Sequence, residues 1–144
     1  MSDLRGTVQI DAPAARVWDV MLDVERWPEW TRTMLEVRRL DAGPLMVGSR
    51  VFVRQPRLRP AEWTVAELDH AERTFTWTTR SFSVLVTARH RVDERGAGST
   101  ATLSVGLSGA LSPVVRALTR SMMKSYLLTE ASGLKARSES VLVG

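Results

Sequence analysis

The sequence has no cysteine, and this absence excludes disulfide bridges, thiolate metal ligands and cysteine nucleophiles. It also has no run of about eighteen apolar residues, so no membrane-spanning helix is expected. The N-terminus lacks the apolar segment that a secretory signal contains, and we therefore expect a cytoplasmic protein. With 144 residues, 44% of them hydrophobic and 25% charged, residues 1–144 have the size and composition of a single globular domain.

Lysine is scarce as well. The formal net charge is +4, yet only Lys124 and Lys135 are lysines, so nearly all of the positive charge comes from arginine. A basic balance can indicate a nucleic-acid or acidic-lipid partner. Most of these arginines are dispersed beside acidic residues, however, and the densest cluster surrounds a predicted loop: Arg50, Arg54, Arg57 and Arg59. Such dispersal is typical of a solvated surface, and no nucleic-acid partner is expected.

Familiar catalytic and metal-binding motifs are also missing. The two histidines, His70 and His90, lie far apart and have no carboxylate partner at a recognisable ligand spacing, so no metal site is predicted. Gly96 and Gly98 join two predicted strands and open no helix, which excludes a phosphate-binding loop. No G-x-S-x-G nucleophile motif occurs. These absences remove most hydrolase and transferase functions, leave the catalytic residues unknown, and give no reason to expect a cofactor.

The longest regular pattern that the sequence does contain is a helix over residues 111–137. Ser112 can cap the first turn, and Pro113 fits the first helical position, where a missing N–H has no cost. Large apolar side chains follow at helical spacing and predict one buried stripe. Its members are Leu111, Val114, Val115, Leu118, Met122 and Tyr126.

Beyond Met122 this stripe continues as the small residues Ser125, Thr129 and Gly133, while larger apolar residues move to a second face. Two interpretations follow. The favoured one is a helix that is buried on two sides and carries small residues where it presses against a sheet. The alternative is that Ser125 and Thr129 leave room for a cavity.

Most of the remaining chain alternates between apolar and polar residues, which is the pattern of β-strands. A strand over residues 7–11 precedes two helices, the first over residues 12–22 and a short second one that starts at Pro28. Strands joined by short turns follow and should pair antiparallel. They cover residues 35–40, 48–55, 62–68, 75–79, 84–92 and 100–107. The predicted fold class is therefore α+β, with a curved antiparallel sheet of six to seven strands wrapped around the C-terminal helix.

Tryptophan is in excess, with five residues against one tyrosine and three phenylalanines. Trp63 and Trp77 lie on adjacent predicted strands, where they either fill the core or line an apolar cavity. His90 lies between Ala88 and Val92 on the apolar side of its strand, so its ring should point inward. An inward histidine is either a hydrogen-bonded core residue or a polar anchor, or general acid–base group, inside a pocket.

These faces predict a ligand-binding cavity between the sheet and the C-terminal helix. The residues expected to bound it are Trp63, Trp77, His90, Met122 and Tyr126. The polar candidates for binding a ligand there are Arg54, Gln55, His90 and Tyr126. Because an unpartnered buried polar group is costly, His90 needs a partner, and either Gln55 or the Tyr126 hydroxyl can supply one without a ligand.

The order of elements resembles the START-like (SRPBCC) superfamily with its helix-grip fold, specifically the polyketide cyclase/dehydrase and lipid-transport branch. The matching segments cover nearly the whole chain. They are residues 10–13, 17–18, 27–30, 48, 63–65, 67–68, 75–77, 98–100, 109 and 133–135. The resemblance implies a curved antiparallel sheet that grips the C-terminal helix, with a cavity between them. Cyclases of this superfamily use an arginine and polar pocket side chains to fold and dehydrate a poly-keto chain, roles that Arg54, Gln55 and His90 could fill here.

Two classes of function compete on these grounds. The leading hypothesis is binding or carriage of a hydrophobic small molecule, such as a lipid, polyketide or isoprenoid, by a monomer or homodimer. It leads because a pocket is predicted and a catalytic constellation is not. The alternative is a polyketide aromatase/cyclase-dehydratase in which His90 or Arg54 assists proton transfer. A weaker alternative is a co-chaperone or interaction module, which predicts a closed, dry core.

Overall fold

The computed structural model describes residues 4–81 and 83–140. Its elements follow the predicted order of one strand, two helical segments, six further strands and a long final helix. In chain order they are β1 (Leu4–Ile10), α1 (Ala14–Leu22), η1 (Val24–Glu29), β2 (Glu36–Arg39), β3 (Arg50–Arg54), β4 (Ala61–Asp69), β5 (Thr74–Ser81), β6 (Val84–Arg95), β7 (Gly98–Ser108) and α2 (Ser112–Ser140). The short element η1 is a 3-10 helix.

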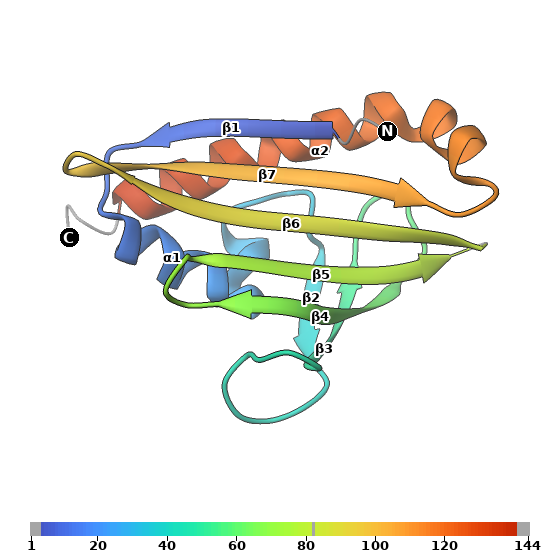
Figure 1. The fold of residues 1–144 in the computed structure, drawn as a ribbon, viewed down its shortest axis with the longest axis horizontal. Coiled ribbons are helices and arrows are strands. Elements are labelled where there is room, and N and C mark those ends of the chain that lie inside the picture. Colours follow the sequence, from blue (N-terminus) through green and yellow to red (C-terminus); the bar gives the residue numbers. More distant parts are fainter. Residues whose placement is uncertain (1–3, 82, 141–144) are drawn as a thin grey trace.

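The seven strands form one sheet in the order β1-β7-β6-β5-β4-β3-β2, and every neighbouring pair is antiparallel. Strands β2 to β7 pair in chain order, as short connections favour, while β1 completes the far edge beside β7 (Figure 1). The register shifts between Val65 and Glu67 of β4, a bulge that bends the strand locally. The predicted antiparallel sheet of six to seven strands is confirmed.

Helix α2 runs along the sheet beside β1 and β7, and its C-terminal half also packs against α1 (Figure 1). Its buried residues recur every three to four positions, as one face of a helix requires. They include Leu127, Ala131, Leu134 and Ser138. This is the helix-grip arrangement that the resemblance implied. Among the described residues, neither α2 nor any other helix is both long enough and apolar enough to cross a membrane.

The first half of α2 turns a different face inward from the one predicted. Leu111, Val114 and Leu118 are 48%, 58% and 81% exposed. Of the predicted stripe only Val115 faces inward here, where it lines an internal cavity together with Thr119, which the stripe did not include. The predicted stripe is therefore wrong at Leu111, Val114 and Leu118. The prediction selected the most apolar face, but a helix that covers a cavity, rather than a packed core, can place a polar threonine on its inner side.

The small residues of α2 permit close packing at one position. A Cβ on Gly133 would collide with the backbone carbonyl of Trp30, so glycine lets α2 approach the end of η1. The favoured interpretation therefore holds at Gly133, although the neighbour is the segment after η1 rather than the sheet. Ser125 is exposed and Thr129 is half-buried, and neither lines the cavity. The idea that these two residues make room for a ligand is wrong.

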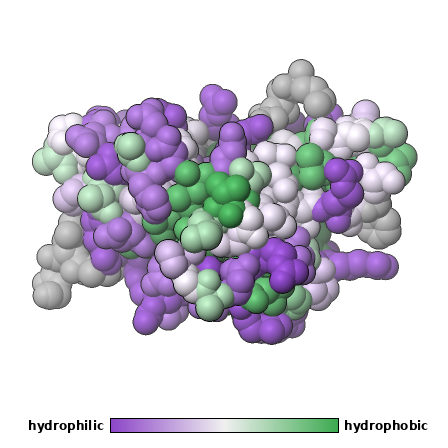
Figure 2. Space-filling model, turned by 60° about the horizontal axis from the view of Figure 1, so that its bottom comes forward, coloured by the Kyte–Doolittle hydropathy of each residue, from purple (hydrophilic) through white to green (hydrophobic). Residues whose placement is uncertain are grey.

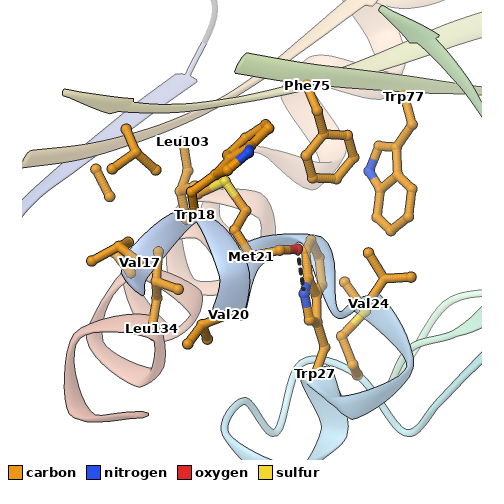
Figure 3. Packing of buried hydrophobic residues seen from close by; sticks show 14 of the residues in the cluster. Val17, Trp18, Val20, Met21, Val24, Trp27, Phe75, Trp77, Leu103 and Leu134 are labelled. Atoms are coloured by element: carbon orange, nitrogen blue, oxygen red, sulfur yellow. Dashed lines mark hydrogen bonds between the residues drawn. The ribbon is translucent and has the colours of Figure 1, made fainter. Parts of the chain in front are cut away.

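A large cluster of buried side chains lies where α1 and η1 meet β5, β7 and α2. Figure 3 shows the side chains that converge there: Val17, Trp18, Met21, Trp27, Phe75, Trp77, Leu103 and Leu134. Trp27 is 1% exposed. Its indole N–H donates to the backbone carbonyl of Met21 across 3.0 Å, which satisfies the one polar atom of the ring. This bond holds η1 against α1 and fixes the Trp27 ring between the core and the cavity.

A second exposed apolar surface lies on the β2–β3 connection, which projects at the bottom of Figure 1. Met46 and Val47 of this connection are 54% and 59% exposed. Figure 2 turns the bottom of Figure 1 forward and shows hydrophobic surface in the middle of that face, bordered by hydrophilic residues. Met46 and Val47 lie outside the cavity, because neither residue lines it.

Candidate functional site

A cavity of about 760 Å³ lies between the sheet and the first two-thirds of α2. Small-molecule sites generally span roughly 300–1,000 Å³. The wall is mainly apolar and is contributed by η1, the inner face of the sheet and α2. Its apolar members include Trp27, Trp63, Trp77, Val84, Val86, Ala88, Leu103, Val105, Val115, Met123 and Leu127. Such a wall suits a ligand that is largely hydrophobic and carries few polar groups.

The structure brings most of the predicted site residues together. The predicted residues that line the cavity are Gln55, Trp63, Trp77, His90 and Tyr126. They come from the β3–β4 loop, from β4, β5 and β6, and from α2. The two remaining candidates, Arg54 and Met122, do not line it.

The position of Arg54 follows from the alternation of side chains along β3. Val51 and Val53 are buried and Gln55 lines the cavity, so Arg54 lies on the opposite face. Its guanidinium Nε is 3.6 Å from a carboxylate oxygen of Glu36, in an exposed ion pair. The predicted place of Arg54 in the cavity is therefore wrong.

The prediction for Met122 is also wrong by one residue, here along the helix. Met123 lines the cavity, and one residue corresponds to about 100° around a helix. The prediction extended the stripe of Leu118 toward Met122. Because that stripe is the exposed face of α2, Met122 follows it away from the cavity.

Trp63, Trp77 and Trp27 form an aromatic wall. The ring centroids of Trp63 and Trp77 are 5.5 Å apart, and those of Trp27 and Trp77 are 5.2 Å apart. Trp77 is 2% exposed and Trp63 is 9% exposed. The two interpretations of these residues, core or cavity, are both correct, because each ring packs on its neighbours and also presents a surface to the cavity.

His90 is buried in this wall as predicted, but its partner is not the one expected. The ring Nδ1 lies 3.1 Å from the backbone carbonyl oxygen of Phe75, the residue opposite His90 in the β5–β6 pairing. The imidazole also stacks on the Phe75 ring, with centroids 4.2 Å apart and an interplanar angle of 8°. The predicted partners, Gln55 and the Tyr126 hydroxyl, are wrong, because the neighbouring strand already offers an acceptor.

The hydrogen bond to Phe75 fixes the chemistry of His90. A carbonyl oxygen can only accept, so Nδ1 carries the proton and Nε2 is left as an acceptor. Burial lowers the pKa of His90 from 6.5 to about 4, and the bond to the Phe75 carbonyl opposes this shift only in part. The ring is therefore neutral at pH 7, and Nε2 can accept a hydrogen bond or a proton.

Glu130 is a cavity residue that the sequence analysis missed. Its carboxylate accepts a hydrogen bond from the Thr33 hydroxyl across 3.2 Å, and the Thr33 and Thr31 hydroxyls lie 2.8 Å apart. Burial raises the pKa of Glu130 from 4.5 to about 7, although the Thr33 bond favours the charged form. The side chain can therefore donate or accept a proton near neutral pH.

A signal for Glu130 was present in the sequence. It is the only acidic residue between Glu94 and Glu139. It also lies three residues after Leu127 and four before Leu134, within the apolar face of the helix. An acid in such a position is seldom a solvated surface residue, because the rest of that face is buried.

Tyr126 joins α2 to the β3–β4 loop. Its hydroxyl donates to the backbone carbonyl of Pro56. In the same loop Arg57 has a φ of 66°, a left-handed conformation that is unusual for a residue with a side chain. Arg57 and Leu58 both line the cavity. The tyrosine therefore holds the loop that closes one side of the cavity.

Comparison with protein families gives a match over nearly the whole chain. The family described as "Polyketide cyclase / dehydrase and lipid transport" matches residues 1–139. No curated protein matches the chain significantly.

Solved structures with the same fold have little sequence in common with this chain. TTHA0849 from Thermus thermophilus superposes with a TM-score of 0.78 at 14% identity, covering 97% of this chain and 99% of that one. The Zhui aromatase/cyclase from Streptomyces sp. R1128 has a TM-score of 0.74 at 19% identity, with 96% and 93% covered. The major latex-like protein 151 from Panax ginseng has a TM-score of 0.77 at 15% identity, with 95% and 97% covered. At these identities, the likeness concerns the fold alone.

Proposed function

Because the chain belongs to the polyketide cyclase/dehydrase and lipid-transport family, we propose that its cavity binds and carries a hydrophobic small molecule. The observation that carries this proposal is the cavity of about 760 Å³ between sheet and helix, lined by three tryptophans and a set of aliphatic side chains. Binding there removes apolar ligand surface from water, which contributes roughly 25 cal/mol for each Å² buried.

The few polar groups of the cavity indicate what such a ligand should carry. The protonated carboxyl of Glu130 can donate to a carbonyl oxygen, while Nε2 of His90 can accept from a hydroxyl group. Gln55 adds an amide that can do either. A hydrophobic skeleton with a few oxygen atoms, as in a polyketide, an oxidised isoprenoid or a lipid, would satisfy these groups.

The test is to fill the cavity without changing the strand that lines it. Ala88 lies on the inner side of β6 and lines the cavity, whereas Thr87 is the adjacent residue and does not line it. Ala88→Phe should reduce binding of the lipophilic fluorophore N-phenylnaphthylamine at least tenfold, and Thr87→Phe should leave binding within about twofold. Equal probe binding by both variants and the parent would refute a ligand-binding cavity.

A second candidate function, an aromatase/cyclase-type enzyme, is favoured by one observation. The same cavity holds a neutral histidine with a free Nε2 and a carboxyl group whose pKa is about 7. In this alternative Glu130 donates its proton to a ketone oxygen, and His90 removes the proton from the adjacent carbon. The resulting enol carbon attacks a second ketone carbon, and this C–C bond closes the ring: the second ketone oxygen takes the proton from His90, and the enol O–H returns its proton to Glu130. Loss of the new hydroxyl group and a proton from the adjacent carbon, as water, then forms a C=C bond in the ring.

Two variants distinguish the enzyme from the carrier. Glu130→Gln and His90→Gln should each slow cyclisation of a poly-keto substrate by roughly 10²-fold or more if these residues transfer protons. If the protein is a carrier, no turnover above the uncatalysed rate is expected from the parent. Arg54 has no role in either scheme, because it lies outside the cavity. The third class, an interaction module with a closed and dry core, is disfavoured by the cavity itself.

A further inference from the structure

We propose that the rim of the cavity docks on an anionic lipid bilayer, from which the hydrophobic ligand enters or to which it returns. The rim is defined as residues 56–60 of the β3–β4 loop, Arg80 and Ser81 at the end of β5, and residues 111–124, which are Leu111 and the start of α2. This proposal rests on the proposed function, because only a hydrophobic cargo requires a membrane source. The argument uses where the cavity opens, which side chains project there and what charge they carry.

The cavity reaches the surface at the rim. Arg57, Leu58, Pro60, Arg80 and Ser81 line the cavity and are also exposed to solvent. Figure 1 places the end of β5 and the start of α2 at the same end of the molecule, at the right of the view. The residues that line the deep part, such as Trp77 and Leu103, are in contrast 2% and 3% exposed.

Apolar side chains project outward from the rim. Leu111, Val114 and Leu118 are spaced at three, four and seven residues, so they lie on one side of α2. Leu118 is 81% exposed, the highest value among the large apolar residues that the structure describes. Leu58 in the facing loop is 36% exposed. Val115, next to Val114, lines the cavity, so this apolar surface continues directly into the cavity wall.

The formal charges of the rim have a single sign. The segments that build it, residues 42–61, 73–92 and 95–129, contain no aspartate or glutamate. They supply the rim cations Arg57, Arg59, Arg80, Arg116, Arg120 and Lys124. The cavity is also lined by Glu62, which is exposed two residues after Pro60 and is ion-paired with Arg50 at 3.7 Å, and by Glu130, which accepts from Thr33. The three segments themselves bring no carboxylate toward an approaching anionic surface.

This combination favours a bilayer over the other possible partners. Exposed leucine and valine beside arginine and lysine are characteristic of helices that lie in the headgroup region of anionic membranes. A second copy of the chain would bring like charges together, which opposes association through this surface. An acidic protein could pair with the cations, but its binding would not explain why apolar side chains project from the same surface.

The experiment measures sedimentation of the full chain with vesicles of phosphatidylcholine alone and with added phosphatidylglycerol. We expect binding only when phosphatidylglycerol is present, and we expect added salt to release the protein. Arg120→Glu with Lys124→Glu should weaken partitioning by at least about fivefold for each cation that is lost. Val114→Ser with Leu118→Ser should also weaken it, because less apolar surface enters the interface.

Matched controls carry the same chemical changes at other surfaces. Arg32→Glu with Arg95→Glu changes the net charge equally but lies outside the rim, and both residues are exposed. Met46→Ser with Val47→Ser removes the exposed apolar pair of the β2–β3 connection, which lies outside the rim. Both controls should partition like the parent. If a control and a rim variant lose binding equally, the assignment to the rim is overturned.

Binding of N-phenylnaphthylamine in solution separates this proposal from the proposed function. None of the substituted rim residues lines the cavity, so each variant should bind the probe like the parent. A protein that binds the probe but not the anionic vesicles overturns the docking proposal and leaves the carrier function intact. If a soluble polyanion such as heparin binds as well as the vesicles do, and Val114→Ser with Leu118→Ser has no effect, the surface serves an acidic macromolecule instead. A dimer that the same double variant dissociates would assign the surface to a second copy.

Discussion

Replacing Glu130 by glutamine should change the pH dependence of stability in a way that no surface carboxylate could. Burial raises the pKa of Glu130 from 4.5 in the unfolded chain to about 7 in the folded one. Below about pH 4.5 both states hold the proton and the group has no effect. Between about pH 4.5 and pH 7, Glu130 ionises in the unfolded chain but keeps its proton in the folded protein. Ionisation therefore favours the unfolded chain, and the free energy of unfolding falls over this pH range.

The magnitude follows from the size of the shift. A rise in pKa from 4.5 to about 7 corresponds to about 3 kcal/mol of unfolding free energy, which is lost by about pH 8. Glutamine keeps the shape and can still accept from Thr33, but it does not ionise. Glu130→Gln should therefore match the parent near pH 4 and exceed its stability by up to about 3 kcal/mol near pH 8.

His90 acts in the opposite direction, so the variant must be compared with the parent at each pH. Burial lowers the pKa of His90 from 6.5 to about 4, and its contribution to stability is present above pH 6.5 and lost as the pH falls toward 4. This loss is the same in the parent and in Glu130→Gln, and it cancels in their difference.

The assay is urea unfolding of both proteins, followed by the fluorescence of the buried tryptophans at several pH values. The reasoning predicts equal unfolding midpoints near pH 4 and a widening gap up to about pH 8. Glu29→Gln is a suitable control, because Glu29 is an exposed partner of Arg137 at 2.8 Å and should give no such gap. A difference between parent and Glu130→Gln that is the same at all pH values would refute a buried, neutral carboxyl.

Three further predictions concern the wall and its supports. His90→Phe should lower the free energy of unfolding by about 1–2 kcal/mol at neutral pH, because the Phe75 carbonyl loses its donor. Near pH 4 the variant should be more stable than the parent, because the unfolded parent chain gains a proton on His90 that the buried ring in the folded parent binds only weakly. Unchanged stability with weakened N-phenylnaphthylamine binding would instead give His90 a role in the pocket alone. Gly133→Ala should lower the free energy of unfolding, measured in urea, by about 1–3 kcal/mol. The control Ser132→Ala, at the exposed neighbouring position, should change it by less than about 0.5 kcal/mol. Equal losses in the two variants would contradict the close approach of α2 to Trp30. Tyr126→Phe removes the hydrogen bond that holds the β3–β4 loop, so the free energy of unfolding should fall by about 1 kcal/mol. Release of N-phenylnaphthylamine, followed by stopped-flow fluorescence, should also be faster, and an unchanged release rate would show that this loop does not gate the cavity.

The fold was accessible from the sequence because strands and turns have local sequence patterns. Alternation over segments such as residues 75–79 and 84–92 places side chains on two faces, and short turns between such segments leave antiparallel pairing as the simplest outcome. The inward position of His90 and the inward rings of Trp63 and Trp77 follow from the same alternation. These positions required no knowledge of distant contacts.

The errors arose where a contact between distant segments decides the outcome. The predicted stripe was the most apolar face of α2, but the sheet and the β3–β4 loop fix the rotation of the helix, so that Val115 faces inward beside Thr119 while Leu111 and Leu118 are exposed. Periodicity identifies a helix and its apolar face, but it does not determine which face of the helix points toward a cavity. Glu130 was missed for the same reason, because a carboxyl is expected on the solvent side.

The partner of His90 shows a different limit. Register between β5 and β6 sets Phe75 opposite His90, and only then does the Phe75 carbonyl become the nearest acceptor. A strand pattern gives the face of a residue but not the residue across from it, because a shift of one position changes every pair.

The separation of charge between cavity and rim constrains the ligand. Inside, the low pKa of His90 and the raised pKa of Glu130 leave both groups largely uncharged about one pH unit below neutral. An ionised carboxylate of a ligand placed beside Glu130 would raise that pKa further and would be poorly solvated. At the rim, Arg57 and Arg80 line the opening and can pair with an anionic end group. We therefore infer that a bound lipid would place its neutral body between Trp77 and α2 and its polar end at the rim, so that a fatty acid should enter tail first.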